Sequence, residues 1–361
     1  MGNSHKIIHF ISSIRRGGME RQLCTIFKYC DKKEFPTKIF YFHASKINYL
    51  SEFNIANNDL ILCNKKTLFQ RFLFTYRLFK KEKPDIVYAW GTVESLITLI
   101  LKPFFDYTFI NGSIRHGIVS KKWSHRLRTG LLHLSSNIIA NSKAGLKANG
   151  LKRGEILYNG LDERFFEEIS LEDKLIDLQY RIDKPVLISV ANLVPYKDYF
   201  TILKALSTLH KEGFIFTYFI IGTGPMKQEI ELKITELDLS KSIILVGGTS
   251  CIKEYLSISN IFIHSSKGEG CSNAILEAMA SGLPIIASDV GGTSEILLPE
   301  FGVLFEYKNS DQLTNYLRQL ILNPELVKKM GEKARIYAEA NFSNTKMIRE
   351  YSNLIHKFRK K

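Results

Sequence analysis

Two glutamates, Glu269 and Glu277, flank the point where a buried strand is expected to give way to a short helix. The apolar strand covers 261–263, a polar loop containing glycine follows, and the helix begins near Asn273. The first-turn N–H groups of a helix have no partner within the helix, so this arrangement forms a site for phosphate. Asn273 and Glu277 are four residues apart and share one face of the helix. The pattern predicts a phosphate site framed by two carboxylates.

The stretch from His264 to Leu297 resembles the signature of retaining, nucleotide-sugar-dependent glycosyltransferases (glycosyltransferase family 4, group 1 type). That signature places two glutamates in the frame E-G-x-x-N-A-x-x-E-A-M-A-x-G-x-P, followed by a D-V-G-G-x-x-E turn. The resemblance implies a GT-B architecture of the α/β class, with two Rossmann-like domains whose parallel sheets face each other across a cleft. It also implies that Glu277 binds the donor's ribose hydroxyls and Glu269 the hydroxyls of the donor sugar.

Further donor contacts follow from the same resemblance. Residues 191–198 resemble a turn in which an arginine and a lysine hold the donor diphosphate. Lys197 matches the lysine, but Asn192 stands where the arginine often is. A second cation would have to come from Arg15, Arg16 or Lys267. The remaining predicted donor contacts are Gly222 in a G-x-G-P turn, Val246 near the nucleobase, and the loop residues Gly270, Cys271 and Ser272.

The first half of the chain carries two more candidates. Gly17 and Gly18 precede a predicted helix, where a glycine pair lets the backbone approach an anion; a tight turn alone would also explain them. Their likeness to the family's G-G-x-E entry favours donor binding. His116 follows a strand in an R-H-G context that resembles the family's histidine facing the donor sugar. Trp123 and His125 remain candidates for acceptor or lipid contacts.

No metal or other cofactor is expected, because the sequence contains no D-x-D motif with metal-site flanks. The five cysteines are odd in number and scattered, which argues against a disulfide framework or a zinc site and favours a reducing compartment. The longest apolar run, near residues 96–105, is too short to span a bilayer. With no signal peptide before the first strand, we expect a cytoplasmic protein that contacts the membrane peripherally.

The net charge of +14 is concentrated in one half of the chain. Residues 1–160 hold 26 Lys and Arg against 10 Asp and Glu, whereas residues 161–361 hold 24 against 26. Such asymmetry indicates a nucleic acid or an anionic lipid surface as partner, although a solvated basic face is the alternative. In the basic segment 65–83, one helical stripe contains Phe69, Phe72, Leu73, Tyr76 and Phe79. A helix that covers the sheet with this stripe is favoured over a helix that lies at a membrane surface, and both can hold if Phe74 and the lysines face lipid.

Apolar runs separated by helix-length segments predict two doubly wound domains. The first is expected at 1–165, a linker at 166–183 and the second domain at 184–341, with a terminal helix at 342–361 that packs back on the first. We expect transfer of a sugar from a nucleoside-diphosphate sugar, with uridine diphosphate favoured. The expected acceptor is a lipid-linked saccharide or a polysaccharide in bacterial-type surface-glycan synthesis, at an anionic membrane and without nucleic acid. The alternatives are an epimerase or glucan synthase of the same fold, or a basic nucleic-acid-binding protein.

Overall fold

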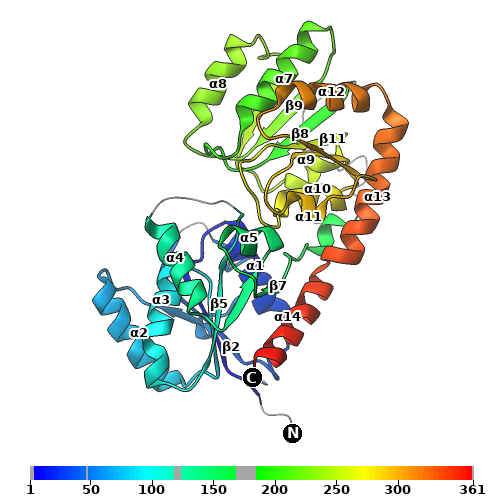
Figure 1. Cartoon of the computed structure of the whole chain (residues 1–361). Helices are drawn as coiled ribbons and strands as arrows, with labels where there is room; N and C mark the ends of the chain where they lie inside the picture. Colours follow the sequence, from blue (N-terminus) through cyan, green and yellow to red (C-terminus); the bar gives the residue numbers. More distant parts are fainter. Residues whose placement is uncertain (1–3, 46–47, 118–122, 168–183, 360–361) are drawn as a thin grey trace. The chain divides into compact units, whose positions relative to one another are not determined.

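The computed structural model describes residues 4–45, 48–117, 123–167 and 184–359 (Figure 1). They form two compact units. Unit 1 runs to Gly160 and includes the C-terminal segment from Asn344, and unit 2 is Leu161–Ser343. The predicted linker at 166–183 lies outside the described residues from 168 onward. Each unit contains an all-parallel sheet with helices between successive strands, so the predicted class of two Rossmann-like α/β domains is confirmed.

The sheet of unit 1 has the strand order β3-β2-β1-β4-β5-β6-β7, so the chain reverses direction across the sheet between β1 and β4. Its strands are β1 (Ile7–Ser13), β2 (Thr37–His43), β3 (Leu60–Leu62), β4 (Ile86–Ala89), β5 (Thr108–Ile114), β6 (Asn137–Ala140) and β7 (Glu155–Ile156). Its helices are α1 (Gly18–Tyr29), α2 (Leu68–Glu82), α3 (Thr92–Leu101), α4 (Trp123–His133), α5 (Lys143–Ala148) and α14 (Asn344–Arg359).

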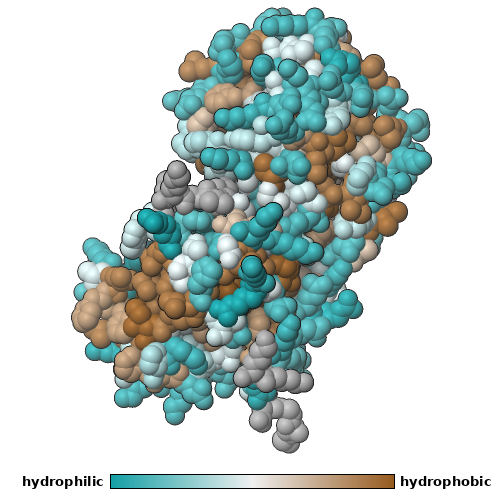
Figure 2. All heavy atoms as spheres, viewed as in Figure 1, coloured by the Kyte–Doolittle hydropathy of each residue, from teal (hydrophilic) through white to brown (hydrophobic). Residues whose placement is uncertain are grey.

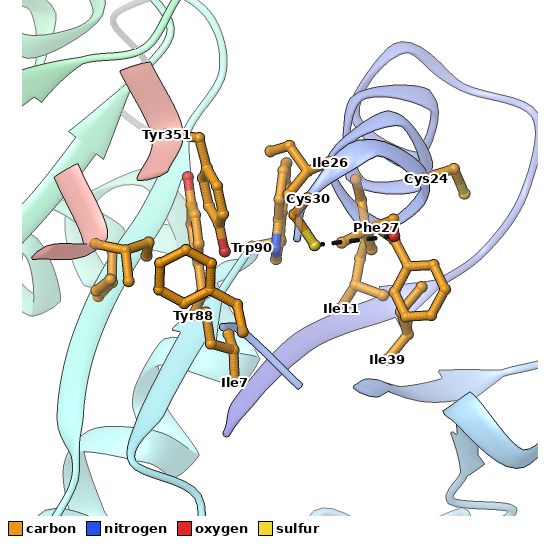
Figure 3. Packing of buried hydrophobic residues seen from close by; sticks show 14 of the residues in the cluster. Ile7, Ile11, Cys24, Ile26, Phe27, Cys30, Ile39, Tyr88, Trp90 and Tyr351 are labelled. Carbon is orange, nitrogen blue, oxygen red and sulfur yellow. Dashed lines mark hydrogen bonds between the residues drawn. The ribbon is translucent and has the colours of Figure 1, made fainter. Parts of the chain in front are cut away.

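Both faces of this sheet are buried, which explains why its strands read as continuous apolar runs. Side chains alternate along a strand, so Ile7 and Ile11 of β1 enter one hydrophobic cluster, which also contains residues of α1 and α14. Ile8 and Phe10 enter another, to which residues of α2 and α3 belong. Figure 3 shows the first cluster, in which Tyr351 of α14 lies beside Tyr88 and Trp90.

A buried histidine joins α14 to the centre of this sheet. The indole nitrogen of Trp90 donates a hydrogen bond to Nδ1 of His9 over 3.0 Å, and Nε2 of His9 lies 3.1 Å from the Tyr351 hydroxyl. Tryptophan can only donate, so the proton of His9 is on Nε2, which donates to Tyr351. Burial, together with the charge of Arg115, lowers the pKa of His9 to about 3. His9 is therefore neutral and ties the last helix to β1.

The sheet of unit 2 has the order β10-β9-β8-β11-β12-β13. Its strands are β8 (Val186–Val190), β9 (Thr217–Ile221), β10 (Ile243–Gly247), β11 (Ile261–His264), β12 (Ile285–Ser288) and β13 (Gly302–Phe305). Its helices are α7 (Tyr199–Lys211), α8 (Lys227–Glu236), α9 (Ile252–Ser257), α10 (Asn273–Ala280), α11 (Thr293–Ile296), α12 (Ser310–Ile321) and α13 (Pro324–Phe342).

Helix α2 corrects one prediction. Phe74 does not face outward but packs against the core, stacked on Phe40 with 5.8 Å between the ring centroids. Thr75, Leu78 and Phe79 are the buried residues of the helix. Phe72, Tyr76 and Phe79 of the predicted stripe do pack in the core. Phe69 and Leu73, which were assigned to the covering stripe, are exposed. The error arose because amphipathic periodicity alone left two neighbouring stripes of aromatic residues, and contact with Phe40 selects between them.

Candidate functional site

The strand order of unit 2 places a reversal point between β8 and β11, where the chain continues from β8 to β9 on one side and from β11 to β12 on the other. In doubly wound sheets, ligands bind outside the carboxyl ends of the strands at such a point. Two loops leave these ends: residues 191–198 after β8 and residues 265–272 after β11. Both carry predicted donor contacts, so the structure brings these contacts to one edge of the sheet.

Backbone hydrogen bonds hold the two loops together. The N–H of Asp198 donates to the carbonyl of Ser265 over 3.1 Å, and the N–H of Lys267 donates to the carbonyl of Tyr196 over 2.8 Å. The Asp198 carboxylate also accepts from the hydroxyls of Thr201 and Ser265, at 2.6 and 3.3 Å, and caps α7. Lys197, between these anchors, therefore starts from a fixed stretch of backbone.

Glycines at 291 and 292 hold the backbone of Glu269. The N–H of Gly292 donates to the Glu269 carbonyl over 2.9 Å. Gly291 has a φ of +55°, and a Cβ atom at this position would collide with the same carbonyl oxygen. This contact requires glycine at 291, because only glycine combines this backbone conformation with so close an approach.

The side chains of Lys197, His264 and Glu269 meet at one point. The Lys197 ammonium donates to Oε1 of Glu269, and Nε2 of His264 lies 2.9 Å from the same oxygen. The Lys197 and His264 nitrogens are 3.2 Å apart. Only 12%, 2% and 12% of the Lys197, His264 and Glu269 side chains are exposed. We call these three residues the polar cluster.

Charge and burial act in opposite directions on the pKa of Glu269. Burial raises it, but the charge of Lys197 and the hydrogen bonds from His264 and Lys197 outweigh burial and hold the pKa well below its usual range. Burial and the Lys197 charge lower the pKa of His264, against the smaller effect of Glu269. The cluster therefore consists of an ammonium, a carboxylate and a neutral imidazole.

Glu277 lies in α10, one turn beyond the loop that carries Glu269. Its side chain is buried, and the apolar residues Ile275, Leu276 and Met279 anchor the helix in the core. Before the helix, Gly270, Cys271 and Ser272 are buried, while Asn273 is half-buried. The structure thus places the two glutamates differently, Glu277 in a packed helix and Glu269 in a loop.

The remaining predicted contacts of unit 2 lie on neighbouring loops. Gly222 follows β9 with a φ of +148°, and a Cβ atom there would collide with the Ala191 carbonyl. Leu193 N–H donates to the Thr223 carbonyl over 2.9 Å, so the loops after β8 and β9 are joined. Asn192 is exposed and Val246, in β10, is half-buried.

The predicted residues of unit 1 lie at the carboxyl edge of its own sheet. Gly17 is the N-cap of α1, and Gly18 is the first residue of the helix. His116 follows β5, and Arg128 of α4 donates to its Nε2 over 3.2 Å and to Nδ1 of His125 over 2.7 Å. Arg15 and Arg16, considered as replacements for the missing arginine, pair with Glu20 and Glu52 at 3.4 and 3.6 Å.

Within the part of the chain that the structure describes, no group of three or more His, Cys, Asp or Glu side chains is arranged to hold a metal ion. Among the same residues, we find no helix with the length and hydrophobicity that crossing a bilayer demands.

The segment of the chain that carries this site matches a known family model. Residues 174–337 match the model described as "Glycosyl transferases group 1". The whole chain resembles the crystal structure of Anabaena Alr3699/HepE in complex with UDP, with a TM-score of 0.83, 20% identity and coverage of 98% of this chain and 100% of that one. This likeness confirms the GT-B type of fold.

Several curated relatives are named as glycosyltransferases. A Campylobacter jejuni protein named N-acetylgalactosamine-N,N'-diacetylbacillosaminyl-diphospho-undecaprenol 4-alpha-N-acetylgalactosaminyltransferase is 28% identical over 59% of this chain and 58% of its own length. The Escherichia coli UDP-Gal:alpha-D-GlcNAc-diphosphoundecaprenol alpha-1,3-galactosyltransferase is 24% identical over 77% of each chain. Several matches span little more than half the length of the curated relatives.

Two polar residues in these sites had no role in the sequence analysis. His264 ends an apolar strand, and a histidine at the carboxyl end of a buried parallel strand was a usable signal, because ligands bind at that edge. Arg128 gave no such signal. Its contacts with His116 and His125 depend on how α4 packs, which the spacing of charged residues in a helix does not determine.

Proposed function

We propose that this chain transfers a sugar from a nucleoside-diphosphate sugar, with uridine diphosphate favoured, to a lipid-linked or polysaccharide acceptor in surface-glycan synthesis. The observation that carries the proposal is the pairing of Lys197 with Glu269 at the reversal point of unit 2, directly before the helix that bears Glu277. The UDP in the Anabaena structure and the diphospho-undecaprenol substrates named for two relatives support it.

The chemistry suits these residue types. Transfer breaks the bond between the anomeric carbon and the diphosphate, so negative charge develops on the leaving phosphate. Lys197 and the first-turn N–H groups of α10 stabilise that charge, most strongly where water is excluded. Glu277 accepts hydrogen bonds from the ribose hydroxyls and Glu269 from the sugar hydroxyls. We propose retention of configuration, with the leaving phosphate taking the acceptor's proton, and no metal ion.

In unit 1, the proposed donor contacts are Gly17, Gly18 and His116, with His116 facing the donor sugar. Arg128 supports this role of His116. An arginine only donates, so Nε2 of His116 accepts its hydrogen bond and the ring's proton is on Nδ1. An imidazole N–H is a donor that suits a sugar hydroxyl or a developing negative charge.

We also propose that unit 1 binds the anionic inner face of a membrane through its α2 surface. This surface combines Leu68, Phe69 and Leu73 with the exposed lysines 65, 66, 80 and 81. Phe69 and Leu68 are 69% and 53% exposed. Figure 2 shows hydrophobic residues gathered where Figure 1 places α2 and α3. Apolar and cationic side chains together match an anionic lipid interface, whereas a nucleic acid would engage mainly the charges.

Calorimetry with uridine, guanosine and adenosine diphosphates tests the donor assignment. We expect at least one to bind with a dissociation constant in the micromolar range, and Lys197→Ala to weaken it by roughly tenfold or more, the size of a lost charged hydrogen bond. Lys204→Ala, an exposed lysine of α7, is the matched control and should leave binding unchanged. Equal weakening by both variants would contradict the site.

A panel of nucleoside-diphosphate sugars then tests the reaction. Release of nucleoside diphosphate that Glu277→Gln abolishes, in a variant that still folds, supports transferase chemistry. Sugar interconversion without release would favour an epimerase, and extension of a glucan primer would favour a glucan synthase. Retention on heparin without binding of any nucleotide would favour a nucleic-acid-binding protein.

A further inference from the structure

The polar cluster gathers a cation and an anion that the proposed function assigns to different parts of one ligand. Lys197 is proposed to hold the donor diphosphate and Glu269 the donor sugar, yet in the structure the Lys197 ammonium donates to Oε1 of Glu269. A carboxylate oxygen thus occupies the position at Lys197 that an anionic oxygen of a diphosphate would take. Glu269 thus supplies a negative charge of the kind that the diphosphate would bring.

His264 makes this arrangement different from a simple ion pair. Its Nε2 approaches the same Oε1 atom at 2.9 Å, closer than the 3.2 Å that separates it from the Lys197 nitrogen. Because the ionised Glu269 carboxylate only accepts, the proton of the neutral imidazole is assigned to Nε2, and two donors converge on one oxygen. His264 is the last residue of β11 and its side chain is almost fully buried, so its ring is held by the sheet rather than by the loop.

The three residues belong to segments with different freedom. His264 is part of the parallel sheet, where its Cα is paired with that of Ala287 in β12. Glu269 lies five residues further on, in the loop after β11. Its backbone carbonyl accepts a hydrogen bond from the N–H of Gly292. Lys197 has a long flexible side chain on the loop after β8. If Lys197 turned toward a ligand, the contact between His264 and Glu269 would remain in place.

We propose that Glu269 is the internal counter-ion of Lys197 in the donor-free site, and that His264 is a positioning residue that keeps Glu269 in place when a diphosphate takes Lys197. This inference rests on the proposed function, because it concerns the same nucleoside-diphosphate site. The exchange moves no proton: the ammonium leaves one anion for another, and the imidazole N–H continues to donate to Oε1. Glu269 then turns its remaining acceptor capacity to the sugar hydroxyls.

Two consequences follow from an exchange of anions at Lys197. Part of the attraction between Lys197 and a diphosphate is offset by the loss of its contact with Glu269, because a buried pair is only weakly screened by water. Removing the charge of Glu269 should therefore tighten the binding of a bare nucleoside diphosphate. It should also weaken recognition of the sugar, so that the two effects have opposite signs in a single variant.

Calorimetry with uridine diphosphate on four proteins tests the exchange: the parent, Glu269→Gln, Lys197→Ala and the double variant. If uridine diphosphate does not bind the parent, the nucleoside diphosphate that does is used throughout. We expect Glu269→Gln to bind at least about fivefold more tightly than the parent, the lower end of typical coupling between sites. In the Lys197→Ala background, the gain should fall to about twofold or less. Glu300→Gln, which removes an exposed charge from the same unit, is the matched control and should leave the affinity unchanged.

His264 is tested by the ratio of two affinities, for uridine diphosphate and for the uridine-diphosphate sugar that binds most tightly in a panel. His264→Phe should leave the first within about twofold and weaken the second by roughly fivefold or more, the cost of one misplaced hydrogen bond. His264→Gln retains an N–H donor and should restore most of the loss. Thermal unfolding of each variant identifies any that fails to fold, and the Gln variant then decides the question.

The outcomes separate this inference from the proposed function. If no nucleoside diphosphate binds the parent, both are overturned. If binding is seen and Lys197→Ala weakens it, but Glu269→Gln fails to tighten it, only the counter-ion inference is overturned. If Glu269→Gln raises the affinity equally in the parent and in the Lys197→Ala background, then Glu269 merely repels the ligand. This outcome also overturns the exchange. A His264→Phe variant whose two affinities fall together would refute the positioning role.

Discussion

Replacing His9 with glutamine should change how the stability of unit 1 depends on pH. In the native chain His9 is buried and neutral between Trp90 and Tyr351, and burial lowers its pKa to about 3. In the unfolded chain its pKa returns to about 6.5. Because the folded pKa is the lower one, the unfolded chain binds the proton first. Stability is therefore complete above pH 6.5 and is lost progressively as the pH falls toward 3.

The two pKa values determine the size of this loss. Proton linkage gives a fall in the free energy of unfolding of about 2 kcal/mol between pH 7 and pH 5 from His9 alone. His9→Gln does not titrate, so this part of the pH dependence should disappear. The variant should also be less stable at both pH values, by about 1 kcal/mol, because the glutamine amide does not place its acceptor and its donor where the imidazole nitrogens meet Trp90 and Tyr351. The informative quantity is the difference between the two proteins' pH dependences.

Urea unfolding followed by the fluorescence of Trp90 measures this quantity. The chain has two tryptophans, and Trp123 is 74% exposed, so a Trp123→Phe background leaves Trp90 as the reporter of unit 1. Tyr351→Phe is the matched control, because it removes a hydrogen bond to the same imidazole but leaves a titratable His9. The control should retain the pH dependence of the parent. If His9→Gln retains it too, then His9 is not a buried neutral residue and the reasoning fails.

Three further predictions concern other parts of the chain. Gly291→Ala should lower the free energy of unfolding by about 1–3 kcal/mol and weaken nucleotide binding. The control Gly213→Ala, also at positive φ but beside open space, should lower the free energy of unfolding by only about 1 kcal/mol and leave binding unchanged. Equal effects of the two variants on binding would contradict the contact between Gly291 and Glu269. Replacing both Phe69 and Leu73 with Asp should lower capture of the protein by anionic liposomes at least about tenfold, given the area these side chains would bury. The control Leu232→Asp, in α8, should not lower it. If the parent protein binds neutral liposomes equally well and salt has no effect, the electrostatic part of the proposal is contradicted. Arg128→Gln should raise the pKa of His125, which burial and the Arg128 charge now lower, and a nuclear magnetic resonance titration that shows no rise would refute that contact.

Most of the fold follows from local patterns in the sequence. The apolar runs at 7–11, 38–42 and 261–263 lie within β1, β2 and β11, because strands buried on both faces must be continuously apolar. Helices α4 and α5 were not predicted. In α4, Gly130 is a poor helix former and only Leu131 and Leu132 are buried, so the segment has little of the amphipathic periodicity on which a prediction depends.

In the site too, residues in local motifs could be predicted, whereas contacts between distant segments could not. Glu269, Glu277 and Lys197 were found because they occur in motifs with fixed spacing. The convergence of Lys197 and His264 on one oxygen could not be predicted, because 67 residues separate the two along the chain. Which side chains meet at the sheet edge depends on the order of β8 and β11, and that order is a property of the whole sheet.

The two glutamates of the signature are held by different interactions, and this bears on what each can do. Glu277 is one turn inside a helix whose apolar neighbours are fully buried, so moving it would mean unpacking α10. Glu269 is held by one backbone contact with Gly292 and by two side-chain donors, all from other segments. A group held by exchangeable hydrogen bonds can change partners while its backbone remains in place. Glu269 is therefore suited to a contact that alternates between an internal cation and a ligand, whereas Glu277 is suited to one that is constant.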